Sequence, residues 1–202
     1  MRHPTACTWC SIGATCLAGL EKKPRAARVR LGHNLAMRVR HAEVGDADRI
    51  AEIHIASWRA AYRGKLDEAY LAALDVAPRE VGWRQTLLGS GESETVVADL
   101  DSVVVGFAHF GPARDLVPTV GEVYAMYLAP DAWGRGIGRS LLLAVERRLR
   151  RRGFEHAMLY VLESNDRAIR FYEASGWERD GGEKRDQLGG RLVTELRYAK
   201  QL

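Results

Sequence analysis

The sequence predicts an α+β fold in three α/β/α layers, with a mixed, mostly antiparallel sheet of about seven strands flanked by about four to five helices. Three observations favour this class. Several segments with strand alternation come before one strand–helix–strand–helix unit, a glycine-rich loop lies inside that unit, and no segment is repeated. The length of 202 residues, with 47% hydrophobic and 28% charged residues, suits one globular domain.

The first half of the domain combines one strand, three helices and a hairpin. Gly45-Asp46 offers a turn and a helix N-cap, Pro78 suits the first position of a helix, and Gly89 ends that helix. Two runs rich in β-branched residues, separated by a short polar break, predict the antiparallel hairpin. The expected elements are a strand at 37–42, helices at 46–63, 67–75 and 78–88, and strands at 95–99 and 102–110.

The second half begins after an expected loop at 111–121. Pro130 closes a strand, Gly153 stops the helix that follows the glycine-rich loop, and Asn165 is placed to cap the next helix. The expected elements are a strand at 122–128, a helix at 138–152, a strand at 156–163, a helix at 166–175, and strands at 177–180 and 191–199.

The first 36 residues differ from the rest in charge. They hold six basic side chains and one acid, whereas residues 37–202 hold 24 basic and 25 acidic side chains, a net charge of roughly −1. Cys7, Cys10 and Cys16 all lie in this segment, and with His3 they offer four potential zinc ligands. We instead predict a disordered leader, or one outside the native protein, followed by a single domain at 37–202 without a metal.

Composition excludes several classes of function. No apolar run approaches the roughly 20 residues that span a bilayer, and residues 11–20 lack the leucine-rich centre of a secretory signal. We therefore predict a cytoplasmic protein without a membrane partner. The near-neutral domain argues against nucleic acid as a partner, and the lack of cysteine in it excludes a cysteine nucleophile. A homodimer stays an open possibility.

The glycine-rich loop is suited to a phosphate ligand. Glycines at 134, 136 and 138 allow positive φ and close approach of a ligand, and they open a helix whose first N–H groups favour anions. A P-loop requires Gly-Lys-Ser/Thr, but here Gly138 is followed by Arg139. A dinucleotide loop requires GxGxxG near the start of a βαβ repeat, but here the spacing is GxGxG and hairpin strands precede it.

The loop Trp133-Gly134-Arg135-Gly136-Ile137-Gly138 resembles the acetyl-CoA loop of the GNAT N-acetyltransferase superfamily, written Q/R-x-x-G-x-G/A. Trp133 stands where the family often has Gln or Arg. Residues 122–130 resemble the family's fourth strand, and residues 165–177 resemble its N-x-x-A-x-x-F-Y-x-x-x-G-F signature, with Trp177 in place of Phe. The resemblance extends over residues 37–198 in the order of elements.

This resemblance implies a GNAT-like domain that uses acetyl-CoA as cosubstrate. Main-chain groups of Met126 and Leu128 would hold pantetheine in a gap between the fourth and fifth strands, and the Leu128 N–H would polarise the thioester carbonyl. Asn165 would reach the pantetheine amides or cap its helix. The pyrophosphate would be held by the amides of six consecutive residues, Gly134, Arg135, Gly136, Ile137, Gly138 and Arg139.

Two side chains are candidate catalysts by the same resemblance. Glu122 is the candidate general base, with a solvent-facing carboxylate as its alternative, and Tyr172 is the candidate acid for the thiolate, with ring packing as its alternative. The implied reaction is acetyl transfer to a primary amine by direct attack in a ternary complex. The alternatives are a non-catalytic acyl-CoA-binding regulatory module and an RNA-directed acetyltransferase.

The amine acceptor, whether a small molecule or a peptide, is not identified by any pattern in the sequence. Trp58 and Tyr62 lie four residues apart on one expected helix. They either line the acceptor pocket or pack in the core, where such spacing is common. His54 and His109 are interpreted as packed side chains.

Overall fold

The computed structural model describes residues 37–114 and 119–202, so the predictions for residues 1–36 fall outside the described residues. The helices are α1 (Ala47–Ala61), α2 (Glu68–Ala73), α3 (Val76–Leu88), α4 (Ile137–Arg151) and α5 (Asp166–Glu173), with short 3-10 turns η1 (Val44–Asp46) and η2 (Pro130–Ala132). The strands are β1 (Met37–His41), β2 (Glu94–Leu100), β3 (Val103–Pro112), β4 (Val120–Leu128), β5 (His156–Leu162), β6 (Glu178–Leu188) and β7 (Arg191–Gln201).

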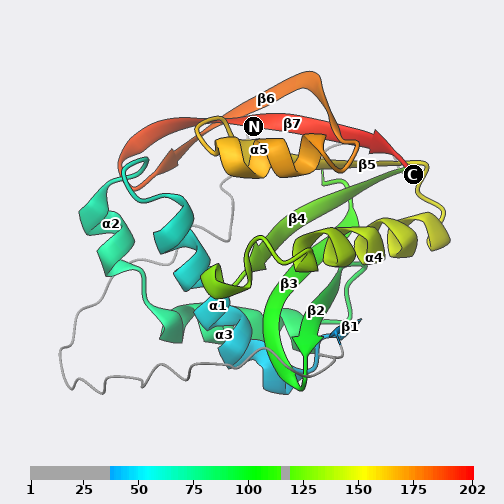
Figure 1. The fold of residues 1–202 in the computed structure, drawn as a ribbon, viewed down its shortest axis with the longest axis horizontal. Helices are drawn as coiled ribbons and strands as arrows, with labels where there is room; N and C mark the ends of the chain where they lie inside the picture. The colour runs from blue at the N-terminus through cyan, green and yellow to red at the C-terminus, as the bar shows by residue number, and fades with distance from the viewer. Residues whose placement is uncertain (1–36, 115–118) are drawn as a thin grey trace, which may run out of the picture.

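The seven strands form one sheet in the order β1-β2-β3-β4-β5-β7-β6. Only β4 and β5 pair in parallel, and every other neighbouring pair is antiparallel. Figure 1 shows the β6–β7 hairpin and α5 along one side of the molecule, with β1 to β4 on the other. The predicted α+β fold with a mostly antiparallel sheet is confirmed.

Helices cover both faces of the sheet, as β4 demonstrates. The Tyr127 ring stacks on His54 of α1, with ring centroids 4.6 Å apart, whereas the Leu128 side chain lies against Gly138 of α4. Because successive side chains of a strand point to opposite faces, α1 and α4 lie on opposite sides of β4. Helix α3 packs on α1. Trp177, just before β6, donates its indole N–H to Glu146 of α4 over 2.9 Å.

The sheet separates between β4 and β5. The two strands pair only from Val120 to Val123 and from His156 to Leu159, although β4 continues to Leu128 and β5 to Leu162. The opposite edge of β5 stays paired with β7 along its whole length. Residues 124–128 and 160–162 therefore face each other across a gap that widens toward the carboxyl ends of both strands.

A β-bulge at Tyr124 sets the direction of the β4 main chain along this gap. His109 of β3 pairs with Ala125 and Phe110 pairs with Val123, so Tyr124 is the additional residue. Ala129 N–H bonds to the Val105 carbonyl over 2.9 Å. Because hydrogen-bonded and non-bonded pairs alternate in an antiparallel ladder, the N–H and C=O groups of Met126 and Leu128 point away from β3 and into the gap.

Three local predictions were wrong. Asp46 occupies the N-cap position of α1 without capping it, because its carboxylate accepts from Arg40 and from Glu43 N–H. Helix α3 begins at Val76, two residues before Pro78, because Asp75 caps it by accepting from Ala77 N–H.

The third wrong prediction concerns β6, which extends to Leu188 instead of ending near residue 180. The glycine pair at 181–182 and the charged residues after it resemble a loop, but pairing with β7 resumes at Glu183 after a register shift. Gly189 and Gly190, both at positive φ, form the turn of the hairpin. In the described residues, no helix is long and apolar enough to cross a membrane.

Candidate active site

A cavity of about 530 Å³ occupies the gap between β4 and β5 and is lined from both faces of the sheet. On one face the lining includes His54 and Trp58 of α1 and Tyr62 directly after this helix. On the other face it includes the glycine-rich loop and Tyr172 of α5. A ligand in this cavity can therefore extend through the sheet, and two ligands can meet there from opposite sides.

The glycine-rich loop forms an open cradle at the start of α4. Gly134 and Gly136 have φ of +72° and +78°, and a Cβ built on either would meet nothing within 4 Å. Gly136 is the N-cap of α4, and no side chain caps the helix. The N–H groups of the first turn thus keep their capacity to bind an anion. Positive φ at both positions explains why glycine is required there.

Trp133 holds this loop to the end of β4. Its indole N–H donates to the Leu128 carbonyl over 3.0 Å. This bond engages the carbonyl of Leu128 and does not involve its N–H, which points into the gap. The Arg167 guanidinium of α5 lies 3.5 Å from the centre of the Trp133 ring. This cation–π contact joins the segments that follow β4 and β5, beyond the carboxyl ends of both strands.

Most residues predicted to bind the cofactor line the cavity together, namely Met126, Leu128, Gly134, Gly136, Gly138, Arg139 and Asn165. Arg135 and Ile137 do not belong to the lining: the Ile137 side chain is buried in the core, and Arg135 is exposed. Asn165 also caps α5, where its carboxamide oxygen accepts from Ala168 N–H over 3.3 Å. Both roles considered for Asn165 are thus geometrically compatible.

Tyr172 lies on the cavity wall, half-buried between Phe171 and Trp177. Burial raises the pKa of its phenol to about 12. The phenol therefore keeps its proton at neutral pH, as a proton donor must. None of the described residues forms a hydrogen bond with this hydroxyl, so the hydroxyl is available to a ligand.

Glu122 also lines the cavity, but Arg114 engages both of its carboxylate oxygens. Arg114 donates from its main-chain N–H and Nε to Oε2, each over 3.2 Å, and from Nη2 to Oε1. Glu122 is 2% exposed. A carboxylate offers about four lone-pair sites, so three donors leave roughly one for a water or a substrate. The partner Arg114 was not anticipated, because no sequence pattern links it to Glu122.

The α1 side of the cavity is aromatic and contains two uncharged histidines. Burial is the main cause that lowers the pKa of His54 to about 3 and of His109 to about 4. The Trp83 indole donates to His54 Nδ1 over 3.3 Å, which places the proton of the neutral ring on Nε2. Trp58 and Tyr62 both pack in a core cluster and line the cavity, so packing in the core does not exclude contact with a ligand in the cavity.

The β6–β7 hairpin completes this side. Lys184, Asp186 and Leu188 alternate along β6 and line the cavity from one face of the strand, and Glu195 of β7 lines it beside them. Sequence reasoning missed these residues because the strand was expected to end near residue 180. The available signal was the Gly189-Gly190 pair, a common hairpin turn, between two charged segments of similar length.

Comparison with known proteins places this geometry in a family. The model of the acetyltransferase (GNAT) family matches residues 47–177. An uncharacterised N-acetyltransferase of Bacillus subtilis, YuaI, is 34% identical over 155 residues, which cover 76% of this chain and 87% of YuaI. A mycothiol acetyltransferase of Rhodococcus jostii is 32% identical over 135 residues, but they cover 58% of this chain and only 44% of that protein.

The fold also matches solved structures. The PaiA N-acetyltransferase of Thermoplasma acidophilum, solved in complex with coenzyme A, superimposes with a TM-score of 0.68 over 83% of this chain and 99% of that chain. The two sequences are 20% identical, so this match shows a shared fold.

Proposed function

Since the chain belongs to the GNAT family of acetyltransferases and is an acyltransferase, we propose that it transfers the acetyl group of acetyl-CoA to a primary amine by direct attack in a ternary complex. The observation that carries this proposal is the cavity through the sheet. A cofactor lying in the gap from the α4 face would present its thioester to an amine that enters from the α1 face.

The cofactor side of the cavity fits a pyrophosphate and an extended amide chain. Gly134 and Gly136 provide the open cradle, and the uncapped start of α4 provides N–H donors for phosphate oxygens. The Met126 and Leu128 main-chain groups would pair with pantetheine as with an additional strand. Arg139 and Arg167 line the same side, and neither has a carboxylate within 4.0 Å among the described residues.

Bound acetyl-CoA supplies an activated acyl group. The amine arrives as an ammonium ion and must lose one proton before its lone pair can attack the carbonyl carbon. Glu122 is the proposed acceptor of that proton, through a water. The Leu128 N–H would stabilise the negative charge that develops on the carbonyl oxygen.

As the N–C bond forms and the C–S bond breaks, the leaving thiolate takes a proton from the Tyr172 phenol. The nitrogen gives up a second proton, which returns the Tyr172 phenolate to the phenol. The raised pKa of Tyr172 keeps that proton available at neutral pH. The products are the acetylated amine, free thiol and one proton released to solvent.

The test combines calorimetric titration of acetyl-CoA with mass spectrometry of a panel of amines and short peptides after incubation. We expect micromolar-range binding, about −8 kcal/mol, and an acceptor heavier by one acetyl group. A folded protein that does not bind acetyl-CoA would overturn the proposal. Binding without transfer to any amine would favour the regulatory module instead.

A further inference from the structure

The charged side chains of the cavity distinguish its two sides. The lining contains three carboxylates, Glu122, Asp186 and Glu195. Glu122 pairs with Arg114, and Glu195 pairs with Lys184 over 2.8 Å. Asp186 accepts only the N–H of Gln187, over 2.7 Å, and has no cation within 4.0 Å among the described residues. The acceptor side therefore carries one unneutralised negative charge.

The position of Asp186 directs this charge toward the acceptor space. Asp186 lies two residues before Leu188 on β6, so both side chains leave the same face of the strand. Leu188 is buried in a cluster with Trp58, Leu66 and Leu71. Asp186 is half-buried and lines the cavity next to this cluster. A half-buried carboxylate attracts a cation more strongly than a fully solvated one.

Aromatic rings surround the same space. Trp58 and Tyr62 pack edge to face with centroids 5.1 Å apart, and both line the cavity together with Tyr127. Aromatic faces favour an ammonium or guanidinium group within about 6 Å. The histidines of this wall are uncharged at neutral pH, because their pKa values are about 3 and 4, and so they do not repel a cation.

From these observations we infer that the acceptor is a diamine or another amine with a second cationic group, which binds between Asp186 and the aromatic rings of Trp58 and Tyr62. This inference rests on the proposed function. The second cation keeps its charge while the reacting amine is acetylated: one nitrogen gains the acetyl group, the thiol leaves with one proton, and the distant ammonium is unchanged.

Three acceptors of matched length test this inference. 1,4-Diaminobutane, 1-aminobutane and 4-aminobutanoate share a four-carbon chain with a reacting amine and end in a cation, a methyl group or an anion. Binding of each is titrated to the protein saturated with CoA, which cannot react, and acetyl transfer is then measured with acetyl-CoA. We expect at least tenfold tighter binding of the diamine than of 1-aminobutane, with the weakest binding for 4-aminobutanoate.

Asp186→Asn should weaken diamine binding at least tenfold and leave 1-aminobutane within twofold, and Asp186→Lys should make 4-aminobutanoate the preferred ligand of the three. The control is Glu178→Gln, which removes an exposed carboxylate of the same strand outside the cavity. Equal binding of all three amines to the wild type, or a diamine preference that survives in Asp186→Asn, would overturn the inference. Selective binding without acetyl transfer would instead count against the proposed function alone.

Discussion

The two sides of the cavity offer a ligand different chemical groups. The proposed cofactor side presents main-chain amides and glycines, together with the cations Arg139 and Arg167. The proposed acceptor side presents side chains, namely aromatic rings and the carboxylate of Asp186. Main-chain recognition requires a particular backbone path and so leaves a glycine pattern in the sequence. Side-chain recognition depends on how distant segments meet in the fold, and it leaves no local pattern.

The largest effect should come from filling the glycine cradle. Gly136→Trp places a large side chain in the open space at the start of α4 and strains a residue at φ +78°. We expect calorimetry to show acetyl-CoA binding weakened on the order of 1,000-fold, or about 4 kcal/mol. Gly153→Trp is the matched control, since Gly153 also has positive φ and open space but lies outside the cavity. Equal losses in both variants would attribute the effect to strain alone.

Removing the Tyr172 hydroxyl tests chemistry at the junction of the two sides. Tyr172→Phe keeps the ring that packs against Phe171 and removes the proton donor. Turnover should fall on the order of 100-fold, a typical contribution of a general acid, while the affinity for acetyl-CoA stays the same. Steady-state kinetics give both quantities. Tyr198→Phe is the control, because its hydroxyl donates to Glu173 and Tyr198 does not line the cavity.

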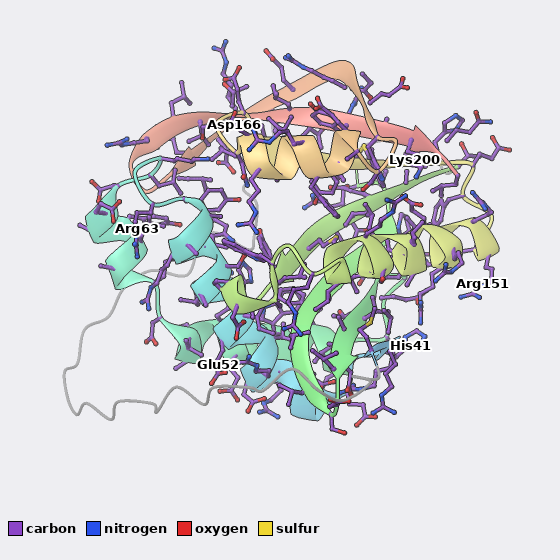
Figure 2. All side chains as sticks on the ribbon, viewed as in Figure 1. His41, Glu52, Arg63, Arg151, Asp166 and Lys200 are labelled. Atoms are coloured by element: carbon purple, nitrogen blue, oxygen red, sulfur yellow. The ribbon has the colours of Figure 1, made fainter. Side chains whose placement is uncertain are left out.

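Acid should destabilise the acceptor side through His54. Its folded-state pKa is about 3 against an ordinary value of 6.5, so between these values the unfolded chain binds a proton that the folded chain does not. The stability from His54 is complete above pH 6.5 and declines as pH falls toward 3. At pH 5 the loss is about 2 kcal/mol. Urea unfolding at pH 7 and pH 5 should show a smaller decline in the free energy of unfolding for His54→Gln than for the wild type. His41→Gln should decline like the wild type, because the His41 side chain, labelled in Figure 2, is exposed.

Glu122→Gln separates proton acceptance from ion pairing. If Glu122 accepts the proton of the amine, turnover should fall about tenfold at pH 7 and less at pH 9, where more of the amine is already deprotonated. A pH–rate profile of each protein measures the difference. The same deficit at both pH values would instead assign Glu122 to the ion pair with Arg114.

The smallest effect concerns the Trp58 indole. Its N–H is the only buried side-chain nitrogen or oxygen of the described residues without a hydrogen-bond partner. Trp58→Phe keeps an aromatic face and removes this donor, so the free energy of unfolding should change by less than about 1 kcal/mol. Trp177→Phe, which removes a donor to Glu146, should cost more. Thermal unfolding of both variants checks this order, and a larger cost for Trp58→Phe would contradict it.

Sequence reasoning predicted the local structure on the α4 side of the cavity, because the determinants of that structure are local. The glycines of the loop, the cap Asn165 and the periodicity of α4 each act within a few residues. The acceptor side required knowledge of tertiary contacts. Arg114 is near Glu122 only because the β3–β4 ladder brings them together. Asp186 lines the cavity only because a charged, glycine-containing segment pairs as β6.

The short pairing of β4 with β5 has a further consequence for solubility. Unpaired strand edges usually invite pairing with other chains and aggregation. The free edges of residues 124–128 and 160–162 instead face each other and line the cavity. The outer strands of the sheet are β1, which has only five residues, and β6, which is rich in charge. The edges of β4 and β5 can thus pair with an extended ligand, but they are not accessible to strands of neighbouring molecules.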